Sequence, residues 1–121
     1  MDFNQYQEAA RKTAIYPRDQ GLVYTALGLV GESGEVAEKV KKLIRGDLLE
    51  QGQFEQDLVK ELGDVLWYVA NLATELGVTL SEVAELNLTK LLDRQKRDVL
   101  NAIKFYGNCD YSKYLKNLIS K

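Results

Sequence analysis

Two pairs of acidic residues have the spacing that places both side chains of a pair on one face of a helix. Glu32 and Glu35 are three residues apart, and so are Glu61 and Asp64. Residues three apart are neighbours on a helical surface. Two such pairs facing one another would supply only oxygen ligands, which suits a hard divalent cation. The spacing therefore favours a carboxylate metal site, with a solvated acidic face as the alternative.

Composition narrows the chemistry that this chain can perform. The sequence has no histidine and one cysteine, Cys109. It therefore excludes imidazole general bases, serine–histidine and cysteine–histidine nucleophiles, and metal sites built from histidine or thiolates. A bound metal would be held by carboxylates and water, and Mg²⁺, Mn²⁺ or Ca²⁺ fits such ligands.

The same composition bears on location and partners. The net charge of −2 gives no basic field that would attract nucleic acid or an anionic membrane. No apolar segment approaches the ~20 residues needed to span a bilayer, and the first residues lack the pattern of a secretion signal. A lone cysteine fits a reducing compartment. We therefore expect a cytoplasmic protein that binds neither nucleic acid nor membrane.

The hydrophobic periodicity predicts an all-α protein with a single domain over residues 1–121. Asp2 with Gln5, and Thr79 with Glu82, have the spacing of capping boxes at helix starts. The proline after Tyr16 should end the first helix. We expect a bundle completed by oligomerisation, because a chain this short buries only a modest core. Its four main helices and a short C-terminal helix span about 3–15, 22–44, 54–76, 79–103 and 111–119.

The second and third helices each carry a polar stripe beside an apolar face. At 100° per residue, the second helix groups Gly28 with Glu32, Glu35 and Lys39. The polar stripe of the third helix contains Glu61, Asp64, Tyr68, Asn71 and Glu75. Its apolar face is expected to form the core and includes Leu62, Leu66 and Leu76. A further strip points away from that face and predicts a second packing surface, such as a subunit contact; it consists of Gly63, Trp67, Ala70 and Thr74.

The lengths of the two helices bring the acidic pairs to the same height. Each pair lies about 10–14 Å from the connecting loop at 1.5 Å per residue. Antiparallel packing would place Glu35 near Glu61 and Glu32 near Asp64. Four close carboxylates repel one another unless a cation or protons intervene. Glycines recurring every three residues predict the close approach of another backbone or a ligand; they are Gly28, Gly31 and Gly34.

The fourth helix carries a basic stripe formed by Asn87, Lys90, Arg94 and Arg97. An amide and three cations on one face are suited to binding phosphate, and a solvated basic face is the alternative. Beside a carboxylate site, such a stripe would allow metal and polyphosphate to be held together.

With these residues the sequence resembles the MazG-like family of all-α nucleoside triphosphate pyrophosphohydrolases. The family pattern is Glu-Glu-x-x-Glu, then Glu-x-x-Asp, then a segment with lysine or arginine on the next helix. The matching segments are 31–35, 61–64 and 87–94, and the resemblance extends over about 3–97. The chain departs from the pattern at Gly31, where the family has its first glutamate.

The resemblance implies hydrolysis of a nucleoside triphosphate to the monophosphate and pyrophosphate, with Mg²⁺ as cofactor and a homodimer or homotetramer as the assembly. It implies metal ligation by Glu32, Glu35, Glu61 and Asp64, and a phosphate clamp formed by Asn87, Lys90 and Arg94. Tyr68 is expected to line the base pocket. Water activation is assigned to Glu35 and to Glu38, which would replace the carboxylate missing at Gly31 or would simply be solvated.

Two other functions stay open at this point. One is a dUTP or dCTP hydrolase of the same all-α superfamily. The other is a non-catalytic helical interaction module with a degenerate acidic site, an alternative that the departure at Gly31 keeps open.

Overall fold

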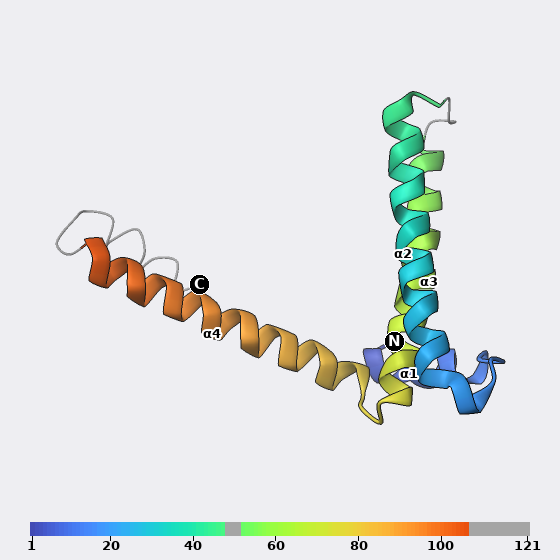
Figure 1. Ribbon diagram of the computed structural model, residues 1–121, viewed down its shortest axis with the longest axis horizontal. Helices are drawn as coiled ribbons and strands as arrows, with labels where there is room; N and C mark the ends of the chain where they lie inside the picture. Colours follow the sequence, from blue (N-terminus) through green and yellow to red (C-terminus); the bar gives the residue numbers. More distant parts are fainter. Residues whose placement is uncertain (48–51, 107–121) are drawn as a thin grey trace. The chain divides into compact units, whose positions relative to one another are not determined.

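The structure, a computed structural model, describes residues 1–47 and 52–106, and side chains as far as residue 101. Within these residues the chain is all α-helical, as expected, and contains no strand. The elements are α1 (Phe3–Lys12), a short 3₁₀ helix η1 (Arg18–Gln20), α2 (Gly21–Arg45), α3 (Gln53–Glu75) and α4 (Leu80–Tyr106) (Figure 1). The predicted short helix at 111–119 lies outside the described residues.

The chain forms two compact units, Met1–Val83 and Ala84–Lys121. The first contains α1, η1, α2, α3 and the start of α4, and the second contains the rest of α4. None of the described helices combines the length and the apolar composition that crossing a lipid bilayer requires.

Local sequence signals set the helix ends. Both predicted capping boxes form: Asp2 Oδ1 accepts the Gln5 N–H at 2.8 Å, and Glu82 Oε2 accepts the Thr79 N–H at 2.7 Å. Helix α1 ends at Lys12, three residues before the predicted end. The reason is that Ala14 and Tyr16 leave the helix to become buried.

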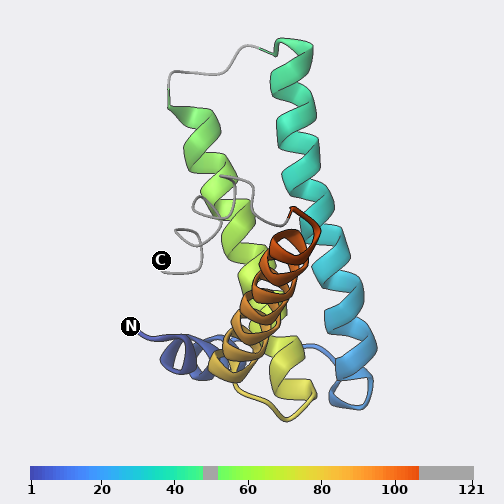
Figure 2. The ribbon, with the colours of Figure 1, turned by 90° about the vertical axis from the view of Figure 1, so that its left-hand side faces the viewer.

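Helices α2 and α3 lie side by side and antiparallel, which is the arrangement needed to bring the two acidic pairs together (Figures 1 and 2). Their register follows from matched steps along the two helices. Gly21 faces Glu75, and seven residues further along α2 Gly28 faces Tyr68, seven residues back along α3. A side chain at Gly28 would overlap the Tyr68 ring, so this position favours glycine, whereas one at Gly21 would displace the carboxylate end of Glu75.

Helix α1 covers the strip of α3 that was expected to point away from the core. Ala70 is fully buried in a core with Ala10 and Leu80. Trp67 packs against this core, and its Nε1–H donates to Thr13 Oγ1 at 2.7 Å. The strip is therefore a second packing surface, as predicted, but at Trp67 and Ala70 its partner is the N-terminal helix of the same chain instead of a second subunit.

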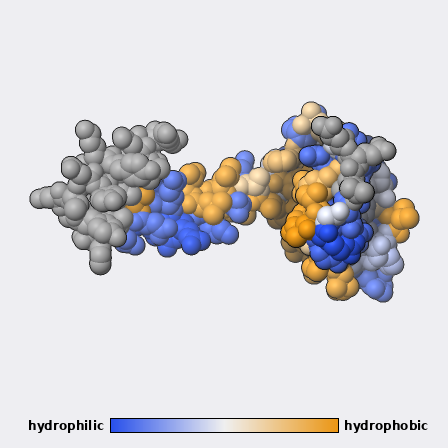
Figure 3. Space-filling view, turned by 90° about the horizontal axis from the view of Figure 1, so that it is seen from above, coloured by the Kyte–Doolittle hydropathy of each residue, from blue (hydrophilic) through white to orange (hydrophobic). Residues whose placement is uncertain are grey.

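Much of the apolar face that was expected to be core is exposed instead. Leu62 and Leu66 are 52% and 37% exposed on α3, and Leu76 is 60% exposed. Leu27 and Val30 on α2 are 69% and 70% exposed. Figure 3 shows apolar side chains, in orange, reaching the molecular surface. The core expected on this face is thus incomplete in the described residues of one chain.

Candidate metal centre

Three carboxylates meet across the α2–α3 pair at the height that the sequence predicted. Glu32 on α2 and Glu61 and Asp64 on α3 each offer one oxygen, and these oxygens lie within 4.8 Å of one another. Glu32 lies four residues after Gly28 on α2, and Asp64 lies four residues before Tyr68 on α3. The pair therefore continues the register of the two helices. We call these three residues the carboxylate cluster.

The cluster is electrostatically unfavourable without a cation. Partial burial raises the pKa of Glu32 above its usual value, and the negative charges of Asp64, Glu61 and Glu35 raise it further. Like charges at this distance oppose one another's ionisation. A divalent cation would relieve this conflict, and the all-oxygen donors match Mg²⁺ or Mn²⁺.

The other two acidic candidates on α2 lie outside the cluster. Glu35 is exposed and acts on Glu32 only through its charge. Glu38 forms ion pairs on its own helix, at 2.7 Å with Lys41 and 4.0 Å with Lys42. The hydrogen bond with Lys41 is the largest cause of the lowered pKa of Glu38. Metal ligation by Glu35 and water activation by either residue stay predictions.

One cation approaches the cluster from α2. Lys39 Nζ lies 3.7 Å from Glu61 Oε1, where Glu35 had been expected. Sequence reasoning placed Lys39 on the same stripe as Glu32 but gave it no role. The signal was its position seven residues after Glu32, two turns along the same face.

Tyr68 lies next to the cluster and anchors an aromatic group. Its ring covers Gly28 and meets Trp67 edge-on at a centroid distance of 4.9 Å. Tyr24 stacks on Tyr16 at 5.1 Å and lies 6.5 Å from Tyr68. Burial is the largest cause of the raised pKa of Tyr68, and Tyr24, Glu32 and Asp64 contribute. Its assignment to a base pocket stays a prediction.

The predicted phosphate clamp lies on α4 in the second unit. Asn87, Lys90 and Arg94 are all exposed. Arg94 Nε lies 3.9 Å from Asp98 Oδ2, one turn further along the same helix. The contact of these three residues with a phosphate tail stays a prediction.

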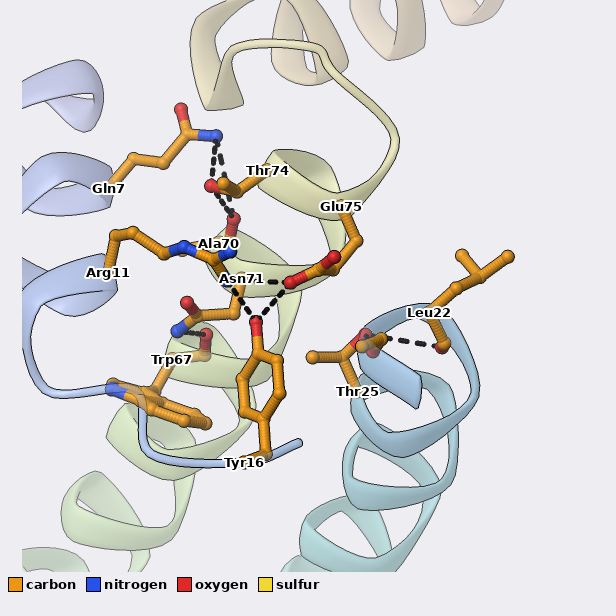
Figure 4. A network of polar contacts seen from close by, with 11 residues as sticks. Gln7, Arg11, Tyr16, Leu22, Thr25, Trp67, Ala70, Asn71, Thr74 and Glu75 are labelled. Carbon is orange, nitrogen blue, oxygen red and sulfur yellow. Dashed lines mark hydrogen bonds and ion pairs between the residues drawn. The ribbon is translucent and has the colours of Figure 1, made fainter. Parts of the chain in front are cut away.

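A second acidic centre on α3 was not predicted. Glu75 Oε1 accepts hydrogen bonds from Arg11 Nη1 and from Tyr16 Oη, both at 2.6 Å (Figure 4). The Arg11 guanidinium also donates to the Tyr16 hydroxyl. We call these three residues the Glu75 cluster. It ties α1, the segment after α1 and the start of α2 to the C-terminal end of α3, since the Glu75 carboxylate packs against Gly21.

These features define an all-α protein in which an antiparallel helix pair presents carboxylates suited to a divalent cation. Residues 20–99 match the MazG nucleotide pyrophosphohydrolase domain. The chain therefore belongs to the MazG nucleotide pyrophosphohydrolase family, and the matched region includes all three residues of the carboxylate cluster.

The chain is also similar to the Gene 37 protein of Mycobacterium phage L5. The two are 49% identical over 109 residues, which cover 83% of this chain and 94% of the phage protein. No solved structure matches the chain.

Proposed function

We propose that this protein hydrolyses nucleoside triphosphates to monophosphates and pyrophosphate with Mg²⁺ as cofactor. The observation that carries the proposal is the carboxylate cluster of Glu32, Glu61 and Asp64, which lies within the region that matches the family. When bound, Mg²⁺ supplies neutralisation of phosphate charge and a lowered pKa for the attacking water.

Different residues would bind the metal and orient the attacking water. Glu32, Glu61 and Asp64 would hold the cation, and the resemblance adds Glu35 as a fourth ligand. Glu35 would also orient the attacking water. Glu38 is the weaker candidate for this task, because Lys41 and Lys42 already engage its carboxylate.

Substrate binding is assigned to residues outside the cluster. The cations of Lys90 and Arg94 would neutralise the phosphate tail, and the Asn87 amide would donate a hydrogen bond to it. Tyr68 would line the base pocket, since its ring lies beside the cluster and its pKa responds to the charges of Glu32 and Asp64.

We also propose that the protein is a homodimer or homotetramer, in the cytoplasm. The exposed apolar residues Leu27 and Val30 on α2, and Leu62 on α3, support association, because a second copy would remove them from water.

The test is incubation with Mg²⁺ and a panel of ribo- and deoxyribonucleoside triphosphates, followed by separate assays for pyrophosphate and orthophosphate. We expect pyrophosphate and the monophosphate in equal amounts. Asp64→Asn should lower kcat/KM by more than about 100-fold, because even residues that merely support metal ligands contribute 10- to 100-fold. Glu55→Gln is the matched control, since Glu55 is an exposed acid on the same helix outside the cluster.

The outcomes separate the alternatives. Orthophosphate as the first product, or unchanged turnover in Asp64→Asn, would contradict the mechanism. Turnover confined to dUTP or dCTP would identify the specialised hydrolase of the superfamily. Failure to turn over any triphosphate would favour the non-catalytic interaction module.

A further inference from the structure

Among the described residues of the first unit, Lys39 forms an ion pair with the carboxylate cluster. Its ammonium lies 3.7 Å from Glu61 Oε1, and the Glu61 side chain is only 18% exposed. An ammonium at this position offsets part of the repulsion among the three acids. It also lies next to a carboxylate oxygen that a divalent cation would need as a ligand.

A second acceptor lies within one helical turn of this ion pair. Asp57 precedes Glu61 by four residues, so both carboxylates lie on the same face of α3. A hydrogen bond from Gln53 is the largest cause of the lowered pKa of Asp57, and the charges of Lys39 and Lys60 lower it further. Gln53 and Lys60 both approach Oδ1 of Asp57, at 2.8 Å and 3.5 Å, and neither contacts Oδ2. The flexible four-carbon stem of a lysine lets its ammonium move between neighbouring acceptors.

We propose that Lys39 is an internal counter-ion of the metal site, which pairs with Glu61 when no metal is bound and transfers to Asp57 when a divalent cation takes Glu61. This inference rests on the proposed metal site and extends it to two residues outside the cluster. Lys39 and Asp57 are positioning residues in this scheme, since they act on the metal through Glu61.

The scheme predicts that removing the charge of Lys39 strengthens metal binding and destabilises the metal-free protein. Replacing Lys39 by methionine removes the competitor, so Mn²⁺ should bind about tenfold more tightly, the scale expected for a unit charge near a divalent cation at a partly solvated site. In the presence of a chelator, the same variant should melt at a lower temperature, because the three acids lose their counter-ion. A substitution that only damaged the fold would weaken metal binding as well.

Asp57 supplies the second half of the test. Asp57→Asn removes a negative charge and should weaken Mn²⁺ binding in any background. It should weaken binding at least about threefold more when Lys39 is present than in Lys39→Met, because only then does the ammonium lose its alternative acceptor. The double-mutant cycle measures this coupling.

The experiment is isothermal titration calorimetry of Mn²⁺ into the full-length protein without nucleotide, with thermal melts in a chelator. Lys41→Met is the matched control: it also removes a lysine from α2, but one that pairs with Glu38 outside the cluster. Lys39→Arg should keep the affinity within about twofold of the wild type, as it retains the charge. Lys39→Gln is a second charge-removing variant of similar length, should the methionine variant fold poorly.

Each outcome bears on a definite claim. Equal Mn²⁺ affinities for the Lys39→Met and Lys41→Met variants, or additive effects of Lys39→Met and Asp57→Asn, would overturn the role of Lys39 and leave the metal site intact. Absence of Mn²⁺ binding by the wild type would overturn the metal site and the counter-ion together.

Discussion

Glu75 on α3 and Glu32 on α2 lie at different heights along the α2–α3 pair, and their surroundings shift their pKa values in opposite directions. Glu75, at the C-terminal end of α3, accepts hydrogen bonds from Tyr16 and Arg11, which are the main causes of its lowered pKa. Glu32, on α2, has a raised pKa because of burial and neighbouring acids. One oxygen of Glu75 accepts two hydrogen bonds, whereas no donor to Glu32 lies among the residues that the structure describes.

The contrast separates a carboxylate that joins parts of the fold from one that we propose as a metal ligand. Donors for Glu75 come from two segments that precede α2, so the Glu75 cluster joins parts of the fold. The carboxylate cluster instead brings three acids together with one nearby ammonium, that of Lys39, so that most of its negative charge is uncompensated unless a cation binds. The following predictions test this distinction, beginning with the largest effect.

Removing the structural carboxylate should destabilise the protein most. Glu75→Ala removes the charged partner of the Arg11 guanidinium and the acceptor of the buried Tyr16 hydroxyl, and should lower the free energy of unfolding by about 3 kcal/mol. Urea denaturation in a chelator measures this. The matched control is Glu32→Ala, which relieves repulsion and should not lower stability. Equal losses in the two variants would remove the distinction.

Glycines on α2 provide a smaller test, because Gly28 lies between the two clusters and Gly31 lies just before the carboxylate cluster. A methyl group at Gly28 would overlap the Tyr68 ring, whereas one at Gly31 would meet nothing within 4 Å. Gly28→Ala should therefore cost about 2 kcal/mol of unfolding free energy through overpacking. Gly31→Ala should gain up to about 1 kcal/mol from helix propensity. A gain in both variants, measured by the same denaturation assay, would show that Tyr68 does not pack closely on α2.

The pH dependence of stability should show the smallest difference, below about 1 kcal/mol after allowing for solvent screening. Glu75 has a lowered pKa, so its contribution is present above its ordinary value of 4.5 and is lost as the pH falls below that value. Glu32 has a raised pKa, so it reduces stability as the pH rises from 4.5 through the raised value.

Thermal melts in a chelator across this pH range test the direction of both effects on stability. Glu75→Gln should lose less stability than the wild type on acidification below pH 4.5. Glu32→Gln should lose less than the wild type as the pH rises above 4.5. Parallel pH profiles for the wild type and both variants would contradict the assigned surroundings.

Local signals explain which parts of the fold could be predicted. Helix ends followed from capping residues such as Asp2 and Thr79, whose partners lie three residues away. The heights of Glu32 and Asp64 followed from the rise per residue and a short connection. These features depend on neighbours in the sequence or on regular helix geometry, so the sequence pattern was sufficient to predict them.

The rest depended on contacts between distant segments. Arg11 and Glu75 are 64 residues apart, and nothing in the polar stripe of α3 distinguishes an acid with a distant partner from a solvated one. Likewise, the ion pair between Lys39 and Glu61 depends on which side chain of α2 reaches across to α3, which the spacing along one helix does not show. Sequence periodicity gives the face of a helix, but not which residue of a facing helix reaches it.

The packing of Trp67 gives the protein a built-in optical signal. It is the single tryptophan of the chain, and its indole meets the rings of Tyr68 and Tyr16 edge-on. Tyr68 in turn lies beside the carboxylate cluster. Fluorescence excited selectively at tryptophan therefore arises from one place, between the N-terminal helix and the site. Titrations with cations or nucleotides can be followed through this emission without attaching a dye.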